Sequence, residues 1–256
     1  MSFDEVAGSG SGQQNAAAFS PEADNVFARI AGRYDRLCDI FSLFAHRLWK
    51  RRMAARMDAG PVSVILDVAS GTGDIPLRFL SRMGGRADVP KILVTDLCPE
   101  MLAFARKKLA KFPDGVDFAI ANAHDLGEIA SGSVDVYSIS FGMKICDRHR
   151  VVAEAFRVLR PGGVFLCLEA ARIPVEWLHF AYLKYMDWCL PVIARIATRD
   201  PSTYDYLLRG IHDFPSPQRF ADEIEAHGFT DVSYENMTLG IVALHRAVKP
   251  HLAQPS

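Results

Sequence analysis

The chain has 256 residues, of which 50% are hydrophobic and 23% charged, and its formal net charge is -1 at pH 7. This balance is typical of a soluble globular enzyme with a sizeable core, and the lack of a basic excess argues against nucleic acid as a partner. We expect a cytoplasmic protein, because the chain has neither a secretory signal nor an apolar run of about 18 residues. Five scattered cysteines and no His-Glu-x-x-His run predict reduced thiols and no metal site.

The N-terminal part of the chain changes character twice. Residues 1–21 are rich in Gly, Ser, Ala and Gln and lack a periodic apolar face, which predicts a disordered tail. Residues 22–60 are predicted to form helices, with Phe41, Phe44, Leu48 and Met53 on the apolar face of the second one.

The end of that second helix carries a cluster of basic side chains. It is either a solvated face that complements the helix dipole, or a surface that attracts an anionic membrane or substrate. Its members are Arg47, Lys50, Arg51, Arg52 and Arg56.

The next segment is the one around which the chain is organised. Residues 62–68 predict a strand buried on both faces, which ends at Asp67 and Val68. Gly71 and Gly73 then allow a sharp turn into a helix and a close approach of the backbone to a ligand. Ligands of doubly wound folds bind in the crevice that such a unit creates.

The glycine pattern favours a nucleoside-type cofactor over a purely structural turn, but it does not favour a dinucleotide. The third glycine of Gly-x-Gly-x-x-Gly would fall at position 76, where the chain has Pro76. A pyrophosphate needs that helix N-terminus to be open and closely packed.

A second strand, residues 91–96, also ends in an acid, Asp96. A carboxylate at this place can accept hydrogen bonds from both hydroxyls of a ribose. It can equally cap the helix that begins at Pro99. Because Asp96 follows Asp67 and the two glycines, we favour ribose binding.

Alternation of strands and helices continues and predicts an α/β fold. Its core is a Rossmann-like, doubly wound, mostly parallel seven-stranded sheet with an antiparallel closing strand. We expect a single domain: N-terminal helices, a cofactor-binding core over 61–170, lid helices over 171–228 and closing strands over 229–249. The remaining predicted strands are 116–120, 134–141, 164–169, 229–234 and 240–245, and further helices are predicted at 99–111, 150–159, 204–211 and 216–227.

Residues 174–197 form an aromatic stretch with apolar residues all around the predicted helix. Such a helix is either ordinary core or a hydrophobic lid over a substrate.

Several motifs between residues 26 and 249 occur together in one known family. Gly-x-Gly is generic, whereas the runs His46–Lys50 and Gly240–His245 are specific. The others are Val26-Phe27, Tyr34-Asp35, Leu66–Asp74, Ala121–Ala123, Ser140–Gly142, Arg157–Gly163 and Leu168-Glu169. With these motifs the chain resembles the UbiE/Coq5 family of ubiquinone/menaquinone C-methyltransferases, which are class I S-adenosylmethionine-dependent methyltransferases.

This resemblance implies S-adenosylmethionine as cofactor, with Thr72 in the loop, Asp96 on the ribose, Asn122 and Ala123 beside the adenine, and Ser140 near the methyl donor. A sulfonium cofactor carries no phosphate, so hydroxyls, the adenine edge and the amino-acid end must be recognised. The predicted cofactor-binding residues are Asp67, Gly71, Thr72, Gly73, Asp96, Leu97, Asn122, Ala123 and Ser140.

Three positions depart from the family pattern. Lys144 and Ile145 stand where the family has an Arg-Asn pair, and Cys38 replaces an asparagine. Methylation of a ring carbon needs an electron-rich phenolate or quinol anion, and an adjacent cation lowers a phenol's pKa by about 1–3 units. We therefore expect Lys144 to be catalytic, with Tyr34 or Asp125 positioning or accepting a proton. The alternative is that Lys144 is a solvated lysine after the strand.

The resemblance implies that the acceptor is a quinol or phenol such as a demethylubiquinol or demethylmenaquinol precursor, with or without a prenyl tail. A specialised aromatic metabolite is the alternative, because the Arg-Asn pair is replaced. A cofactor-binding module and a nicotinamide oxidoreductase are further alternatives. Peripheral contact with the inner face of the membrane and assembly as a homodimer are compatible with the sequence.

Overall fold

The structure is a computed structural model that describes residues 27–58, 64–84, 89–197 and 210–251. The predicted N-terminal tail and nearly all of the helix predicted at 204–211 lie outside these residues. Among the described residues, none of the helices has the length and apolar character needed to cross a membrane.

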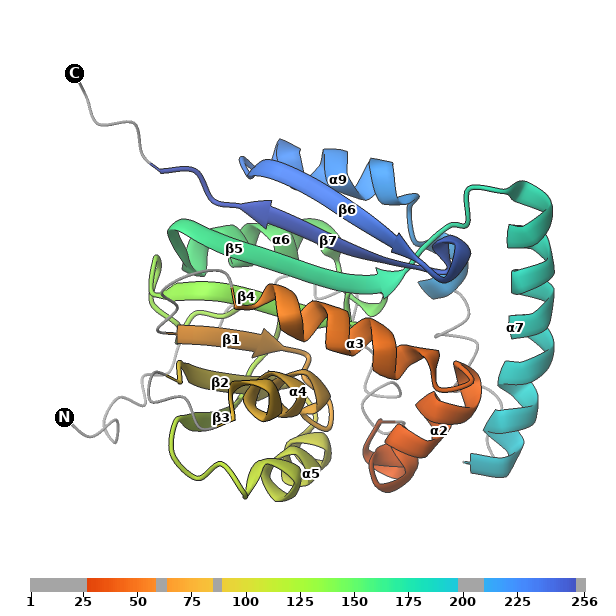
Figure 1. The fold of residues 1–256 in the computed structure, drawn as a ribbon, viewed down its shortest axis with the longest axis horizontal. Helices are drawn as coiled ribbons and strands as arrows, with labels where there is room; N and C mark the ends of the chain where they lie inside the picture. The colour runs from red at the N-terminus through yellow and green to blue at the C-terminus, as the bar shows by residue number, and fades with distance from the viewer. Residues whose placement is uncertain (1–26, 59–63, 85–88, 198–209, 252–256) are drawn as a thin grey trace, which may run out of the picture.

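A seven-stranded sheet forms the centre of the molecule, in the order β3-β2-β1-β4-β5-β7-β6 (Figure 1). Strands β1 to β5 run parallel, and β7 pairs antiparallel with both β5 and β6. The predicted doubly wound sheet with an antiparallel closing strand is confirmed. The strands are β1 (Val64–Val68), β2 (Lys91–Asp96), β3 (Val116–Ile120), β4 (Val134–Ser140), β5 (Leu159–Ala170), β6 (Thr230–Met237) and β7 (Val242–Val248).

Helices cover both faces of this sheet, so its central strands are buried on both sides (Figure 1). Neighbouring residues of β1 show this, because Ile65 packs into one core cluster and Leu66 into the other. One face is covered by α3 (Ala45–Arg56), α4 (Asp74–Met83) and α5 (Pro99–Leu109), and the other by α6 (Arg148–Val158) and α9 (Pro217–Ala226).

Strand β5 begins earlier than its apolar run suggests. It starts at Leu159, which pairs with Val134 ahead of an irregularity in the β4–β5 register, and it continues through Pro161 and Gly162. The sequence predicts a helix up to residue 159 and a strand only from residue 164. Cross-strand pairing outweighs the weak strand preference of Pro161 and Gly162.

The N-terminal elements are η1 (Ala31–Arg33), α2 (Tyr34–Phe41) and α3. The face predicted for α3 is confirmed at Met53, which is fully buried, and wrong at Phe44 and Leu48, which are exposed. The side chains that α3 buries are His46, Trp49, Lys50, Met53 and Ala54. These buried positions also follow the helical period, but they include a histidine and a lysine, so an apolar pattern does not reveal them.

Helix α7 (Glu176–Ala197) stands at one end of the molecule, beside α2 (Figure 1). Tyr182 and Met186 face a cavity, whereas Trp177 and Trp188 lie on the exposed side. The aromatic stretch is therefore not ordinary core, and its position over a cavity fits the lid interpretation. By contrast α9, which falls within the predicted lid segment, packs on the sheet through Phe220.

Candidate active site

The glycine loop follows β1 and leads into α4. Gly71 and Gly73 have φ values of 57° and 74°, a region that glycine enters at little cost. A methyl group on Gly73 would lie 3.1 Å from both Ala105 Cβ and Leu109 Cδ1, so this glycine permits close packing of α5. Of the two predicted glycines, only Gly71 lines a cavity at the loop.

A cavity of about 660 Å³, part of it open to solvent, lies at the carboxyl ends of β1, β2 and β4. This is the crevice in which open α/β sheets bind ligands. The predicted cofactor residues on its wall are Gly71, Asp96, Leu97, Asn122, Ala123 and Ser140.

Asp96 holds the two loops beside the cavity. Its Oδ2 accepts the backbone N–H of Gly71 at 2.7 Å, and its Oδ1 accepts that of Cys98 at 2.9 Å. It is not the cap of α5, because Cys98 is the residue at the N-cap position. Asp96 therefore fixes the loop and lines the cavity.

A small polar cavity continues from the first one at Gly71 and Ser140, and Asp67, Thr72 and Lys50 also line it. Asp67 Oδ1 accepts the Ser138 hydroxyl at 2.5 Å. Asp67 Oδ2 and Ser140 Oγ are buried without a hydrogen-bond partner among the described residues. Burial raises the pKa of Asp67 to about 6. Buried polar atoms of this kind require a partner, which a ligand can supply.

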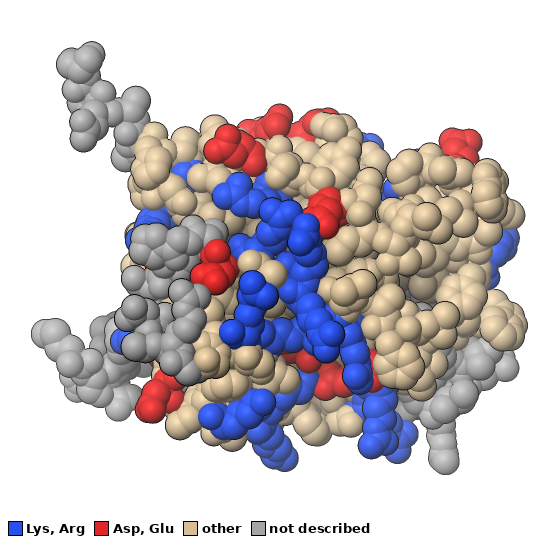
Figure 2. Space-filling model, viewed as in Figure 1, with Lys and Arg blue, Asp and Glu red and all other residues tan. Residues whose placement is uncertain are grey.

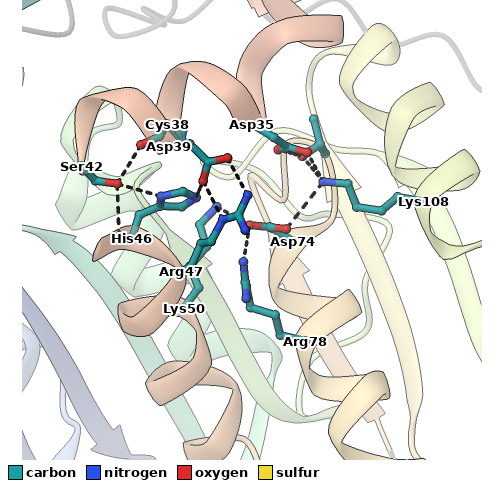
Figure 3. A network of polar contacts seen from close by, with 11 residues as sticks. Asp35, Cys38, Asp39, Ser42, His46, Arg47, Lys50, Asp74, Arg78 and Lys108 are labelled. Atoms are coloured by element: carbon teal, nitrogen blue, oxygen red, sulfur yellow. Dashed lines mark hydrogen bonds and ion pairs between the residues drawn. The ribbon is translucent and has the colours of Figure 1, made fainter. Parts of the chain in front are cut away.

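Thr72 and Lys50 belong to a network of polar contacts that joins four helices and the loop (Figure 3). The Thr72 hydroxyl donates to Asp35 at 2.7 Å, and Lys108 donates to Thr72 at 2.8 Å. Lys50 Nζ lies 3.1 Å from Asp74 Oδ2, and both side chains are largely buried. The cations Lys50, Lys108 and Arg78 outweigh burial and hold the pKa of Asp74 well below its usual range.

The same network fixes the turn between α2 and α3. Asp39 accepts two hydrogen bonds from Arg47, each at 2.6 Å, and the Ser42 hydroxyl lies 2.8 Å from His46 Nδ1 (Figure 3). The hydrogen bonds from Arg47 lower the pKa of Asp39, and burial lowers the pKa of His46 to about 4. His46 is therefore neutral at pH 7, and the turn has a defined geometry.

A second, larger cavity of about 1410 Å³, part of it open to solvent, adjoins the first and shares Phe27, Tyr34 and Phe141 with it. Its wall comes from α2, α3, β5, α7 and β7, and most of the exposed wall is apolar. The polar exceptions include Cys38, Ser42, His46, Lys50, Lys144 and Thr238.

Lys144 lies in η2 (Met143–Ile145), on the wall of this apolar cavity. Its Nζ is 3.1 Å from Glu169 Oε1 and also donates to the carbonyl of Phe141, while its backbone N–H donates to Glu169 Oε2. The side chains of Lys144 and Glu169 are 8% and 0% exposed. The lysine is therefore a buried, paired cation with one N–H left to donate.

Tyr34 is the one side chain shared by all three cavities. The neighbouring Cys38 thiol and burial raise the pKa of Tyr34 well above its usual value. Burial also raises the pKa of Cys38. Tyr34 thus stays protonated near neutral pH, so the structure favours positioning over proton acceptance among its predicted roles.

The structure does not bring Asp125 to these cavities. Asp125 is exposed, and its carboxylate accepts the backbone N–H of Gly127 at 3.1 Å in a tight turn. The neighbouring His124 is buried, and its Nε2 accepts the backbone N–H of Asp147 at 2.9 Å. Both residues therefore shape the loop after β3.

No role at the site was predicted for Lys50 or for Glu169, although both belong to motifs shared with the family. Lys50 appeared as one of five basic residues on a helix, yet it is buried and lines two cavities. Its spacing from Trp49 and Met53 was the available signal, because all three share the buried face of α3. Glu169 looked like the end of a strand, and only the fold places it against Lys144.

Comparison with known proteins gives both a family and a fold. The structure superposes on a Thermotoga maritima S-adenosylmethionine-dependent methyltransferase, described as a possible histamine N-methyltransferase, with a TM-score of 0.60, 17% identity and coverage of 89% and 99% of the two chains. It also matches Haemonchus contortus phosphoethanolamine N-methyltransferase 2 in complex with S-adenosylhomocysteine, with a TM-score of 0.56, 16% identity and coverage of 81% and 53%. These likenesses show the fold.

Sequence relatives are closer. The chain is 42% identical over 223 residues to the ubiquinone/menaquinone biosynthesis C-methyltransferase of Acidiphilium cryptum, covering 86% of this chain and 87% of that protein. It is 38% identical over 240 residues to the mitochondrial 2-methoxy-6-polyprenyl-1,4-benzoquinol methylase of Schizosaccharomyces pombe, covering 88% and 78%. The family model of the ubiE/COQ5 methyltransferases matches residues 15–249. The chain therefore belongs to the ubiE/COQ5 methyltransferase family and is an S-adenosylmethionine-dependent methyltransferase.

Proposed function

We propose that this enzyme methylates a ring carbon of a quinol that carries an apolar tail. The observation that carries this proposal is the large apolar cavity, which shares Phe27, Tyr34 and Phe141 with the cavity at the sheet edge. A ring lying at the shared wall would be next to the cofactor, and its tail would fill the apolar space. The names of the relatives support a quinol over a specialised aromatic metabolite, and family membership disfavours the binding-module and oxidoreductase alternatives.

The residues of the first cavity fit the nucleoside part of S-adenosylmethionine. Asp96 lines this cavity beside the glycine loop, at the end of β2, and we assign its carboxylate to the two ribose hydroxyls. The side-chain oxygen of Asn122 accepts a hydrogen bond from the backbone N–H of His124. The NH₂ group of Asn122 can therefore donate to the adenine edge. Ala123 and Leu97 supply apolar contact on the same wall.

The small polar cavity fits the amino-acid part of the cofactor, which carries an ammonium and a carboxylate. Asp67 has an unpartnered carboxylate oxygen for the ammonium, and Lys50 lines the same cavity with a buried ammonium for the carboxylate. Ser140 adds an unpartnered hydroxyl. Opposite charges of the ligand would therefore meet opposite charges of the protein in a buried setting, where such pairs are strong.

Bound S-adenosylmethionine supplies an electrophilic methyl group. The side chains of the apolar cavity would prepare the acceptor. Lys144 has one N–H left to donate to a ring oxygen, and the ammonium favours the anionic form of that oxygen. Glu169 holds Lys144 in place through both its backbone N–H and its ammonium.

Tyr34 lies between the two ligands and would fix the ring as a hydrogen-bond donor. Helices α2 and α7 enclose the acceptor, which excludes water and aligns the ring carbon with the methyl group. Such alignment contributes about 7–11 kcal/mol in favourable cases. An apolar tail keeps the acceptor in lipid, so we include peripheral contact with the membrane in the proposed function.

Methyl transfer is tested with isotope-labelled S-adenosylmethionine and a short-chain demethylquinol kept reduced in solution. We expect a product heavier by one CH₂ that retains the label on a ring carbon. The variant Asp96→Ala should lose both S-adenosylhomocysteine binding and turnover. Cofactor binding by the wild-type protein without transfer to any quinol would contradict the proposed function.

The assignment of Lys50 is tested by binding of two ligands, S-adenosylhomocysteine and 5′-methylthioadenosine, which lacks the amino-acid end. Lys50→Met should weaken the first by about 10- to 100-fold, which corresponds to a lost charge-assisted hydrogen bond, and leave the second unchanged. Lys108→Met is the matched control, because Lys108 also contacts Asp74 but lines neither cavity. Equal losses for both ligands would refute the assignment.

A further inference from the structure

The turn between α2 and α3 presents large apolar side chains to solvent. Leu43 and Phe44 have φ values of 46° and 66°, a region that residues other than glycine rarely enter. Leu43 is 78% exposed, and Phe44 is exposed beside it. The ion pair of Asp39 with Arg47 holds this turn in its unusual conformation (Figure 3). A conformation that strains the backbone and exposes apolar surface does not serve folding.

More exposed apolar side chains lie at the same end of the molecule. Leu48 is exposed one turn along α3, and Leu239 in η3 (Thr238–Gly240) is 75% exposed. The hydrogen bond from Trp49 to Thr238, 2.8 Å long, ties η3 to α3. On α7, Trp177 and Trp188 are 73% and 69% exposed.

Part of this exposed apolar surface borders the apolar cavity. Leu43 belongs both to the exposed turn and to the cavity wall, Thr238 lines the cavity beside Leu239, and Tyr185 of α7 lines it from the other side. We call Leu43, Phe44, Leu48, Trp177, Phe180, Trp188 and Leu239 the apolar rim. An exposed apolar patch of this kind marks an interaction site.

Basic side chains lie next to the apolar rim. Figure 2 shows a stripe of Lys and Arg over α3, beside a broad area without charged side chains over α7. Arg51 is exposed and lies three residues after Leu48 and seven after Phe44, which is the spacing of side chains on one side of a helix. A helix whose apolar side chains are bordered by Lys or Arg is of the kind that lies in the interface of a bilayer.

We infer that the apolar rim docks on an anionic lipid bilayer, so that the apolar cavity opens toward the acyl chains. This inference rests on the proposed function, because an acceptor with an apolar tail would enter from lipid. Arginines beside the rim complement anionic headgroups, and tryptophans prefer the membrane interface. The acidic side chains nearby are neutralised by cations, as in the pairs Asp187–Lys184 and Asp39–Arg47.

Vesicle co-sedimentation tests this surface, with phosphatidylcholine alone or mixed with phosphatidylglycerol. Wild-type protein should bind the mixed vesicles at least tenfold more tightly, and salt should weaken the binding. Phe44→Ser with Leu48→Ser should reduce binding by tenfold or more, since each buried apolar side chain is worth about that factor. Ile120→Ser on the edge strand β3 is the matched control, because Ile120 is 59% exposed but far from the rim in sequence and fold.

Neither Phe44 nor Leu48 lines a cavity, so the double variant should methylate a short-chain quinol in solution at the wild-type rate. Intact vesicle binding without any quinol methylation would refute the proposed function and leave the surface standing. Unchanged vesicle binding in the double variant and in Trp177→Ser with Trp188→Ser would overturn the inference. The inference would also be overturned if wild-type protein does not bind vesicles and forms a dimer that the double variant cannot form.

Discussion

Replacing Asp67 with asparagine should make the cofactor-free protein more stable at neutral pH, although Asp67 is part of the proposed cofactor site. Its carboxylate is buried, and one oxygen has no hydrogen-bond partner among the described residues. Burial raises its pKa from 3.8 to about 6. At pH 7.5 the Asp67 carboxylate is charged in both states, and this charge costs more free energy in the folded protein than in the unfolded chain.

The magnitude follows from the shift. A difference of about two pKa units corresponds to about 3 kcal/mol at 1.36 kcal/mol per unit. Because the folded pKa is the higher one, the contribution of Asp67 to stability is fully present below pH 3.8 and lost as the pH rises through about 6. Asp67→Asn removes this dependence of stability on pH. The variant's unfolding free energy should therefore equal that of wild type near pH 4 and exceed it by at most about 3 kcal/mol above pH 7.

Urea unfolding of both proteins between pH 5 and 7.5 measures this gap, and calorimetry with S-adenosylhomocysteine should show weaker binding by the variant at pH 7.5. Asp74→Asn is a control of opposite sign, because three cations hold the pKa of Asp74 below its usual range. It should lower stability at neutral pH. An Asp67→Asn protein that is less stable than wild type at pH 7.5, or a gap that does not vary with pH, would refute the reasoning.

Three further predictions concern single contacts. Lys144→Met should cost about 3–5 kcal/mol of unfolding free energy, because it leaves the Glu169 carboxylate buried and unpaired, and adding Glu169→Gln should recover much of that loss in urea titrations. Gly73→Ala should cost about 1–2 kcal/mol in the same assay through its φ of 74° alone. Asp125→Ala should change neither turnover nor S-adenosylhomocysteine affinity, because Asp125 is exposed in a turn; a loss of turnover would return it to the site.

The sheet could be predicted from the sequence because its strands are apolar runs with clear ends. The strand-loop-helix pattern also predicts the positions of Asp67, Gly71 and Asp96. The carboxyl ends of the neighbouring parallel strands β1 and β2 meet at the same edge of the sheet. Gly73 was assigned to the cofactor, but the structure uses it to admit α5. A sequence shows that a glycine is needed and does not show which side of the backbone is crowded.

The substrate side was harder to predict because it is built from segments far apart in the chain. The apolar positions of α3 indicated that Phe44 and Leu48 were buried, but the helix turns His46 and Lys50 inward instead. Burial of a lysine depends on a partner, and Asp74 lies on another helix. Such a partner appears only when the helices are packed together.

The position of β7 has a consequence for synthesis of the protein. It is the last strand in the described chain, yet it lies between β5 and β6 and makes hydrogen bonds to both. Until residues 242–248 have left the ribosome, the apolar strand β5 lacks its partner on one edge, and β6 has no strand to pair with. The sheet can close only after this segment leaves the exit tunnel. We therefore expect chaperones to bind the nascent chain mainly before β7 has paired.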